Sequence, residues 1–353
     1  MSEKMLAAYL PGDGTTELKY VDIPAPGHGE VLIRMKASTV CGSDIKGIYH
    51  NPRESRPESF RNNIAGHEPC GQIAKCGPGM RRFKEGDRVI VYHISGCGIC
   101  FECRKGYQIN CSSPIRAAYG WDRNGGMAEY LLADEKDLVP LPDNMSYLDG
   151  AMIACGFGTV YEGLENIGVC GKDSVLVVGL GPVGMAALTV AKALGAKKLI
   201  GVDIVKERCD IVTEKGIAHH ALVSSGDTLG EVMKLTGGAG VSKAVDCSGS
   251  PGGRLLAVQA VGKWGRIAFI GEGATVEFAP SSDLMHYQKT IFGSWVTSIW
   301  RMEELTMQLS DWGVHPDALI THKFPLEKAP EAFELMYGGK CGKVAVVFDE
   351  LLK

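Results

Sequence analysis

The amino-acid sequence predicts an α/β protein in which a β-rich first part precedes a doubly wound parallel sheet. Three observations predict this class. The first 150 residues hold short apolar runs separated by glycine and proline. From about Asp173, short continuous apolar runs alternate with helical patterns. A glycine-rich turn, Gly179–Gly184, lies between the first of these runs and the first helix. The chain has 353 residues, of which 45% are hydrophobic, which suffices for two domains with separate cores.

The first part is expected to consist of strands joined by tight turns. Val31–Met35 and Asp87–Val91 are apolar runs of strand length, and the prolines and glycines within residues 24–29 are typical of turns. In the second part a helix is expected from Met185 to Leu194, ended by Gly195. Its strands are expected at residues 174–178, 198–202, 243–247, 265–270 and 290–292. Alternation of this kind favours a parallel sheet with right-handed crossovers.

After about Ser294 the pattern changes again. Helices are expected at Arg301–Trp312 and Pro330–Tyr337, and a final strand at Lys343–Phe348. We expect this tail to return to the first part. The predicted domains are therefore residues 1–156 with 294–353, and residues 157–293.

Composition excludes several classes of protein. The net charge is −4 and no basic block is present, so a nucleic-acid partner is not expected. No apolar stretch reaches 18 residues, and the N-terminus has no signal-like apolar run, so no membrane segment is expected. The 12 cysteines allow disulfides, but the chain is large and its thiols cluster at metal-type spacing. A cytoplasmic location with metal-bound and free cysteines fits better.

Four of the cysteines lie within 15 residues. Cys97, Cys100, Cys103 and Cys111 follow one another at spacings of 3, 3 and 8. Thiolates at such spacing can converge on one ion, and four sulfur ligands close a tetrahedral zinc site. Because a closed site has no open position, we expect it to stabilise a loop and to take no part in a reaction.

The glycine-rich turn carries a nucleotide-binding pattern. Gly179, Gly181 and Gly184 follow a strand and open a helix, with Pro182 and Val183 between them, and a second strand ends in Asp203. The glycines permit a tight turn, close approach of a diphosphate and close packing of helix on sheet, while the helix N-terminus favours an anion. Asp203 is expected to accept hydrogen bonds from the ribose hydroxyls and to favour NAD over NADP. The alternative is that Asp203 only closes its loop.

Other residues that can bind a metal are scattered. Cys41, His67 with Glu68, and Cys155 each stand in a short glycine-containing segment. A lone cysteine is most often a small buried apolar residue, and a lone histidine often fills a core. Spacing alone does not bring these residues together.

The whole chain, however, resembles the zinc-dependent medium-chain alcohol and polyol dehydrogenases, a family that includes sorbitol, threonine and alcohol dehydrogenases. The resemblance is carried, in family order, by Cys41–Asp44, Gly66–Glu68, Gly86–Val89, the four-cysteine loop, Gly125–Tyr130, Cys155–Tyr161 and the nucleotide pattern. It implies a GroES-like β-rich catalytic domain and a Rossmann domain that binds NAD.

The resemblance also implies a second, reactive zinc. Its ligands would be Cys41, His67 and Cys155, with Glu68 as an alternate ligand and Asp44 orienting His67. A purely structural buried carboxylate is the alternative for Glu68. Sorbitol-type members often have Glu where this chain has Cys155. The implied activity is hydride transfer between NAD and an alcohol whose hydroxyl is acidified by zinc.

Several further roles follow from the resemblance. Ser43 matches the hydroxyl that accepts the substrate proton, although it could instead make a turn hydrogen bond. Relatives pass the proton to a histidine where this chain has Lys46, so His50 or water would have to replace it. Lys343 matches a basic position near the cofactor diphosphate, with a solvated surface lysine as the alternative.

The substrate pocket is less defined by sequence. His93 falls where relatives place a substrate-facing side chain, and Tyr119, Trp121 and Trp295 are further candidates. A histidine there favours a polar substrate. The loop of residues 51–63 contains three arginines, Arg53, Arg56 and Arg61. One interpretation is a pocket rim that binds sugar hydroxyls or a negative group. The alternative is a solvated loop.

The sequence therefore favours an enzyme, a dehydrogenase of secondary alcohols or polyols with two zinc ions per chain, NAD and a small-molecule substrate. A non-enzymatic NAD-binding structural or regulatory protein on the same fold is the alternative. The resemblance also implies a homo-oligomer, a tetramer or a dimer.

Overall fold

The structure is a computed structural model that describes residues 3–348. The chain forms two compact units, Met1–Gly158 with Thr297–Lys353 (unit 1) and Thr159–Val296 (unit 2). The sequence places the second domain at residues 157–293, two residues before the observed start and three before the observed end. The residues that follow unit 2 belong to unit 1.

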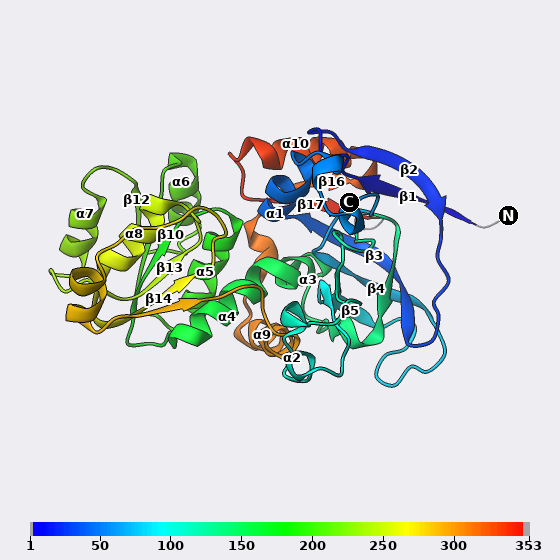
Figure 1. Cartoon of the computed structure of the whole chain (residues 1–353), viewed down its shortest axis with the longest axis horizontal. Helices are drawn as coiled ribbons and strands as arrows, with labels where there is room; N and C mark the ends of the chain where they lie inside the picture. The colour runs from blue at the N-terminus through cyan, green and yellow to red at the C-terminus, as the bar shows by residue number, and fades with distance from the viewer. Residues whose placement is uncertain (1–2, 349–353) are drawn as a thin grey trace. The chain divides into compact units, whose positions relative to one another are not determined.

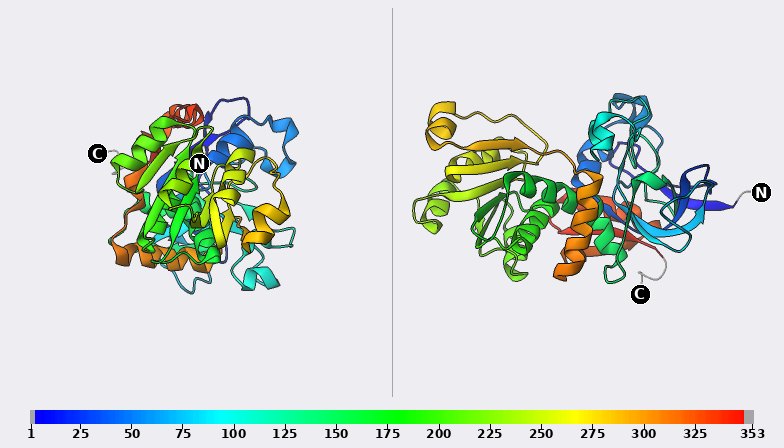
Figure 2. Two further views of the ribbon diagram at one scale, coloured as in Figure 1. Left: turned by 90° about the vertical axis from the view of Figure 1, so that its left-hand side faces the viewer. Right: turned by 90° about the horizontal axis from the view of Figure 1, so that it is seen from below.

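Unit 2 is a six-stranded parallel sheet in the order β12-β11-β10-β13-β14-β15. The order reverses between β10 and β13, which is where ligands bind in sheets of this kind. Figure 1 and the left view of Figure 2 show the strands side by side, with helices around them. The strands are β10 (Ser174–Val178), β11 (Lys198–Asp203), β12 (His220–Val223), β13 (Val241–Asp246), β14 (Val261–Phe269) and β15 (Thr290–Gly293).

The helices of this part are α4 (Gly158–Ile167), α5 (Pro182–Ala193), α6 (Lys206–Glu214), α7 (Thr228–Leu235) and α8 (Pro251–Ala260). Leu176, Val178, Ile200 and Ile267 form the centre of the core between sheet and helices. These strands are buried on both faces, which explains their continuous apolar runs. The sequence analysis missed β12, because this edge strand begins with a histidine and is only partly buried.

One residue of β14 has an unusual backbone. Trp264 has φ +62° and its side chain is 73% exposed. The register between β13 and β14 shifts between Val241 and Lys243, beside this point. A large side chain in the left-handed region is strained, so Trp264 stores conformational energy at a bulge.

Unit 1 is built on a sheet in the order β16-β17-β3-β4-β5-β9, with β8 also pairing to β3. Two antiparallel two-stranded sheets, β1–β2 and β6–β7, complete it. The strands are β1 (Lys4–Tyr9), β2 (Glu17–Asp22), β3 (Glu30–Val40), β4 (Pro69–Cys76), β5 (Arg88–Val91), β6 (Ile94–Ser95), β7 (Ala117–Ala118), β8 (Tyr130–Asp134), β9 (Leu138–Pro140), β16 (Ile320–Pro325) and β17 (Lys343–Val347).

The helices of unit 1 are mostly short. They are α1 (Gly42–Asp44), α2 (Phe101–Arg104), α3 (Tyr147–Met152), α9 (Ile299–Trp312) and α10 (Ala329–Gly338), with π-helical turns η1 (Ile45–Tyr49) and η6 (Ile153–Phe157). Strand β17 is entirely buried and pairs antiparallel with β3, so that Val344 lies opposite Val40. The last described strand therefore lies inside the unit 1 sheet, between β16 and β3.

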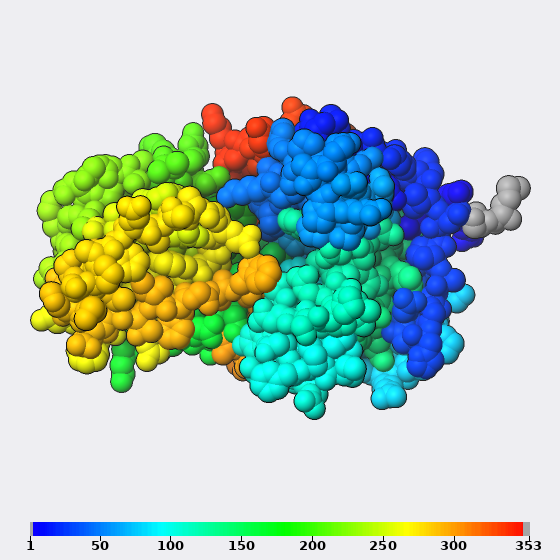
Figure 3. Space-filling view, viewed as in Figure 1, coloured from blue at the N-terminus to red at the C-terminus, as the bar shows by residue number. Residues whose placement is uncertain are grey.

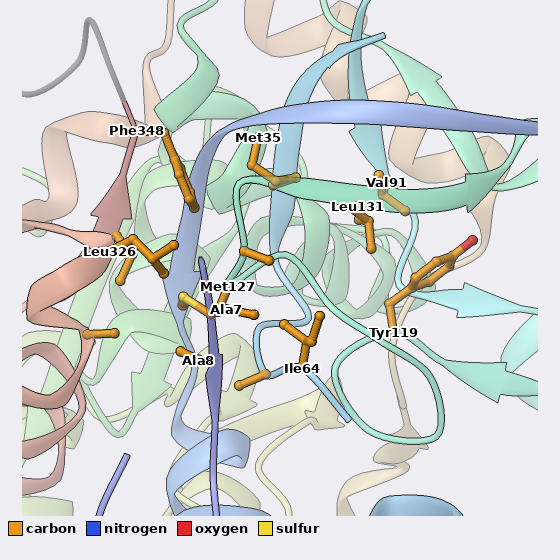
Figure 4. Packing of buried hydrophobic residues seen from close by; sticks show 14 of the residues in the cluster. Ala7, Ala8, Met35, Ile64, Val91, Tyr119, Met127, Leu131, Leu326 and Phe348 are labelled. Carbon is orange, nitrogen blue, oxygen red and sulfur yellow. The ribbon is translucent and has the colours of Figure 1, made fainter. Parts of the chain in front are cut away.

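The core of unit 1 joins residues from distant parts of the chain. Figure 4 shows Met127 close to Ala7 and Ala8, with Leu326 and Phe348 from the C-terminal segment nearby. All of these side chains are buried. Within residues 3–348, no helix has the length and apolar character needed to cross a membrane.

Candidate metal centre and nucleotide site

Four side chains from three segments of unit 1 meet in one cluster. Cys41 follows β3, His67 and Glu68 precede β4, and Cys155 lies in the π-helical turn η6. One donor atom of each lies within 4.8 Å of the others. The cluster contains the residues that the resemblance implies as ligands, and it arises because β3 and β4 pair while α3, which leads into η6, packs on β3.

The imidazole of His67 is oriented by Asp44. Its Nδ1 donates to Asp44 Oδ1 at 2.7 Å, and both side chains are buried. Burial alone lowers the pKa of His67, but the charge of Asp44 and its hydrogen bond outweigh this effect and raise it well above its usual range. Because Asp44 keeps the proton on Nδ1, Nε2 is the nitrogen that would lose its proton to a metal ion and bind it.

Glu68 is fully buried and is held by one oxygen. Its Oε2 contacts Lys343 Nζ at 2.5 Å and accepts a hydrogen bond from Thr39 Oγ1 at 2.5 Å. Its Oε1 has no hydrogen-bond partner within the described part of the chain. Burial raises the pKa of Glu68 to about 7 against the opposing charge of Lys343. A buried carboxylate oxygen without a partner fits a metal ligand.

Lys343 is not a surface lysine, so that alternative is wrong. Its side chain is 3% exposed, and it lies on β17 one residue before Val344, which pairs with Val40, the neighbour of Cys41. Burial lowers the pKa of Lys343, but the charge of Glu68 outweighs burial and raises it. No pattern along the chain indicates this pairing, since a lysine at the start of an apolar strand usually reaches solvent.

A hydrogen bond joins the two sulfur atoms of the cluster. A hydrogen bond from Cys155 lowers the pKa of Cys41 well below its usual range, and the same bond raises the pKa of Cys155. Two sulfurs, one imidazole nitrogen and a carboxylate oxygen form the donor set that zinc prefers. The residues therefore fit a zinc ion.

The four-cysteine loop forms a second cluster. Cys97 and Cys103 have their sulfurs 3.9 Å apart, and those of Cys100 and Cys111 are 3.8 Å apart, far beyond a disulfide bond. These distances are close to the ~3.8 Å edge of a tetrahedron with Zn–S bonds of about 2.3 Å. Backbone N–H groups of Ile99 and Cys100 lower the pKa of Cys97 to about 6, which favours a thiolate ligand. The loop is exposed on the face of unit 1 in Figure 3, in cyan.

The three glycines of the turn before α5 in unit 2 meet different structural requirements. Gly179 has φ +90°, and a Cβ there would lie 2.7 Å from the Ser248 nitrogen. A Cβ on Gly184 would lie 1.8 Å from the Gly179 oxygen, so α5 packs directly on the turn. Around Gly181 the nearest atom is Arg208 Nη1 at 4.0 Å. This open space, at the N-cap of α5, fits the approach of a cofactor diphosphate.

Asp203 ends β11 and closes the loop around it. Its Oδ2 accepts the Leu180 N–H at 2.6 Å, and its Oδ1 accepts the Val205 N–H at 2.8 Å. Asp203 therefore closes its loop, and Oδ1 keeps a second lone pair with which to bind a hydroxyl. Arg208 Nη1 lies 3.5 Å from Oδ2, an interaction that sequence reasoning missed.

Two of the candidate pocket residues lie beside the cluster. The ring of His93 is 5.3 Å from that of His67, and its Nδ1 donates to the Ala154 carbonyl at 2.9 Å. Burial lowers the pKa of His93 to about 3, so its ring is neutral. Trp121 Nε1 lies 3.4 Å from His67 Nδ1. A Cβ on Gly47 would lie 2.3 Å from the Trp121 ring, which shows how closely this wall is packed.

Other candidates lie elsewhere. Tyr119 is fully buried and its hydroxyl donates to Asp137 Oδ2 at 3.1 Å, so its placement as a substrate-facing residue is wrong. The ring centroids of His50 and Tyr337 lie 4.2 Å apart with the rings tilted, and Lys46 is exposed. Trp295 belongs to unit 2 and is 56% exposed.

The arginine-rich loop is held by its own side chains. Arg56 is buried and donates to the carbonyls of Leu10 and Pro11, while Arg61 donates to those of Glu54 and Arg56. Arg53 lies 3.9 Å from Glu17. Arg56 therefore belongs neither to a pocket rim nor to a solvated loop, because its guanidinium satisfies buried backbone groups.

Two family models match the chain. The alcohol dehydrogenase GroES-like domain matches residues 27–143, and the zinc-binding dehydrogenase domain matches residues 182–312. The chain is 52% identical to the zinc-type alcohol dehydrogenase-like protein YphC of Escherichia coli, over 98% of this chain and 99% of that protein. It is 33% identical to L-threonine 3-dehydrogenase of Pyrococcus horikoshii, over 98% and 99% of the two chains.

Solved structures agree. An alcohol dehydrogenase of Escherichia coli CFT073 complexed with NADH has a TM-score of 0.87 at 26% identity and covers 98% of this chain and 100% of its own. Acetophenone reductase of Geotrichum candidum in complex with NAD has a TM-score of 0.82 at 25% identity and covers 99% and 98%. Sequence models, relatives and fold therefore coincide over nearly the whole chain, which belongs to the family of zinc-dependent medium-chain alcohol dehydrogenases.

Proposed function

We propose that this oxidoreductase transfers hydride between NAD(H) and a secondary alcohol or polyol at a zinc ion held by Cys41, His67 and Cys155, with Glu68 as alternate ligand. The cluster of these four side chains carries the proposal. Its donor set suits zinc, and the unpartnered Oε1 of Glu68 can be displaced without leaving the carboxylate unpaired, because Lys343 still contacts Oε2.

When bound, zinc would supply a Lewis acid that lowers the pKa of a substrate hydroxyl, and NAD would supply the hydride acceptor. The side chains do the remaining work. Asp44 fixes the His67 ring, and Ser43 Oγ lies 3.4 Å from His67 Nε2, so its hydroxyl is placed beside the cluster to accept the substrate proton. Lys46 and His50 are both exposed, so we propose that the proton leaves through water.

NAD is the proposed cofactor. The clear space at Gly181 and the N-terminus of α5 would hold its diphosphate, and Asp203 would accept hydrogen bonds from its ribose. The negative charge of Asp203 would repel a 2′-phosphate, although Arg208 reduces this effect. Affinity for NAD and for NADP, measured by titration, tests this part of the proposal.

A polar substrate is favoured over a plain aliphatic alcohol. His93 is neutral and its Nδ1 donates to Ala154, so its Nε2 carries a lone pair that can accept a hydrogen bond from a second hydroxyl. Trp121 supplies an apolar wall beside the same cluster. This combination supports a diol, a sugar alcohol or a similar compound.

We further propose a second zinc at Cys97, Cys100, Cys103 and Cys111, and a homo-oligomer. The sulfur distances support the second ion. Metal analysis is expected to give two zinc ions per chain, and light scattering a dimer or a tetramer.

A panel of sugar alcohols, inositols, diols and simple alcohols, assayed with NAD by absorbance of NADH, tests the activity. Cys41→Ser is expected to abolish turnover while the fold and NAD binding remain, and Cys170→Ser, at an exposed cysteine outside both clusters, is the matched control. Absence of NADH formation from every alcohol by zinc-loaded protein would favour the alternative, a non-enzymatic NAD-binding protein.

A further inference from the structure

The backbone register of unit 1 places one hydroxyl behind the metal cluster. Thr39 lies two residues before Cys41 on an extended strand, so both side chains point to the same face of the sheet. Its N–H faces the Glu68 carbonyl at 3.4 Å on one side, and Ala345 of β17 lies opposite Thr39 on the other. Thr39 and Lys343 thus come from neighbouring strands to the same carboxylate.

Both donors use the same oxygen of Glu68. Thr39 Oγ1 and Lys343 Nζ each lie 2.5 Å from Oε2, and all three side chains are buried. Neither contacts Oε1, which has no hydrogen-bond partner within residues 3–348. A carboxylate anchored by one oxygen in a dry site keeps its other oxygen directed away from the anchor.

We propose that Thr39 is a positioning residue: its hydroxyl, together with the Lys343 ammonium, holds Glu68 by Oε2 and directs Oε1 at the metal. This inference rests on the proposed function and deepens it. Glu68 then occupies the fourth position of the resting centre, and Thr39 sets how readily it yields that position to the substrate.

Lys343 alone would not fix the carboxylate. An ammonium is a compact point charge that tolerates rotation of its partner. A hydroxyl has one proton and a preferred direction, so it restricts that rotation. Thr39 Oγ1 also lies 3.3 Å from the carbonyl of Ala151 in α3, the helix that leads to Cys155. The hydroxyl therefore stands between the segments that carry two of the ligands.

The first test measures metal loss. Thr39→Val removes the hydroxyl at constant shape, and release of the reactive-site metal to a chelator is expected to become about tenfold faster. Metal released from the reactive site is identified as the phase of the release curve that is absent when Cys41→Ser is treated with the same chelator. Thr39→Ser, which keeps the hydroxyl, is expected to behave like the wild type. Ser38→Ala is the matched control, because Ser38 is the adjacent buried hydroxyl on β3 and makes no hydrogen bond to Glu68.

The second test asks whether Thr39 acts through Glu68. In a Glu68→Gln background, Thr39→Val is expected to change the release rate less than twofold, because amides are poor zinc ligands. An unchanged tenfold effect in that background would overturn the proposal, as would a wild-type release rate in Thr39→Val alone.

The third test needs no variant of Thr39 and so is independent of its folding. With cobalt in the reactive site, the visible absorption of the wild type and of Glu68→Gln is expected to differ, since one ligand has changed. Identical spectra would show that Oε1 is not a ligand and would overturn the inference.

The KM of an alcohol distinguishes a role of Thr39 in positioning Glu68 from a general disruption of the fold. If Glu68 competes with substrate, Thr39→Val is expected to lower KM several-fold, whereas disruption of the fold would raise it. Failure of every alcohol to react would refute the proposed function, while metal release and cobalt absorption would still judge the role of Thr39.

Discussion

Asp44 and His67 form a buried pair in which Nδ1 donates to Oδ1 at 2.7 Å. The same carboxylate accepts the Cys41 N–H through Oδ2 at 3.0 Å. One side chain therefore orients two of the residues proposed to bind zinc.

We expect Asp44→Ala to weaken zinc binding at the reactive site by about 10–100-fold, because the His67 ring loses its orientation. Competition with a chelator measures this change. Asp44→Asn keeps an acceptor oxygen and is expected to lose less. Equal affinity in Asp44→Ala and wild type would contradict the role given to this pair.

Removal of the four-cysteine site should affect stability and leave the chemistry of folded molecules intact. We expect Cys103→Ser to lose one zinc and about 3 kcal/mol of unfolding free energy, or roughly 6–12 °C in melting temperature. Turnover per folded chain should persist. Metal analysis and calorimetry check these values, with Cys170→Ser as control; loss of turnover at full stability would be the opposite result.

Substitutions of two glycines in the nucleotide turn should affect NAD binding and folding separately. Gly181→Ala adds a methyl group to open space and should leave stability unchanged, while the dissociation constant for NAD rises by about tenfold or more. Gly184→Ala places its methyl group against the Gly179 oxygen and should destabilise unit 2. NAD titration and thermal melting measure both effects. Unchanged NAD affinity in Gly181→Ala would refute the proposed diphosphate position.

Asp137 should make stability depend on pH. Burial raises the pKa of this carboxyl to about 7, above its unfolded value. Below the unfolded pKa both states are protonated; as pH rises towards 7 the folded state retains the proton and loses stability relative to the unfolded state. We expect Asp137→Asn to gain on the order of 2 kcal/mol relative to wild type between pH 4 and pH 8.

Asp134 is the control with the opposite sign. Burial alone would raise its pKa, but the hydrogen bond from Arg123 and the nearby charges lower it. Its stabilisation is present above the unfolded pKa and is lost as pH falls through the folded pKa. Asp134→Asn should therefore lose stability at pH 7, and denaturant unfolding across pH measures both variants. Parallel pH profiles for wild type and Asp137→Asn would contradict the assignment for Asp137.

Replacing Trp264 with glycine should stabilise the folded protein. A left-handed backbone costs about 1–2 kcal/mol for a residue with a Cβ, and the exposed indole contributes little burial. We expect Trp264→Gly to raise the free energy of unfolding by about 1 kcal/mol. Trp264→Ala keeps the strain and should not gain. Equal stabilities of the two variants in urea would exclude relief of strain.

Much of the fold was predictable because strands buried on both faces of a sheet are continuous apolar runs in the sequence. The run Ser174–Val178 is buried on both faces and became β10 with the same bounds. The final strand was found for the same reason. Strand β12 was missed because an edge strand needs no continuous apolar run.

The site was predictable only through the resemblance, since Cys41, His67 and Cys155 are far apart in sequence. The partners behind the ligands were not predictable in this way. Thr39 and Lys343 reach Glu68 because three strands align in one register, and a register is a property of the sheet rather than of any one segment. Arg56 was misread because nothing in its segment reveals that backbone carbonyls surround it.

The pairing of β17 with β3 has a consequence during translation. The ribosome releases β3, the cysteines and His67 first, then all of unit 2, and only at the end the strand that pairs with β3. Until then β3 presents an open edge on its β17 side and Glu68 lacks its cation. Unit 2 can fold as the chain emerges, whereas unit 1 must wait for its last strand.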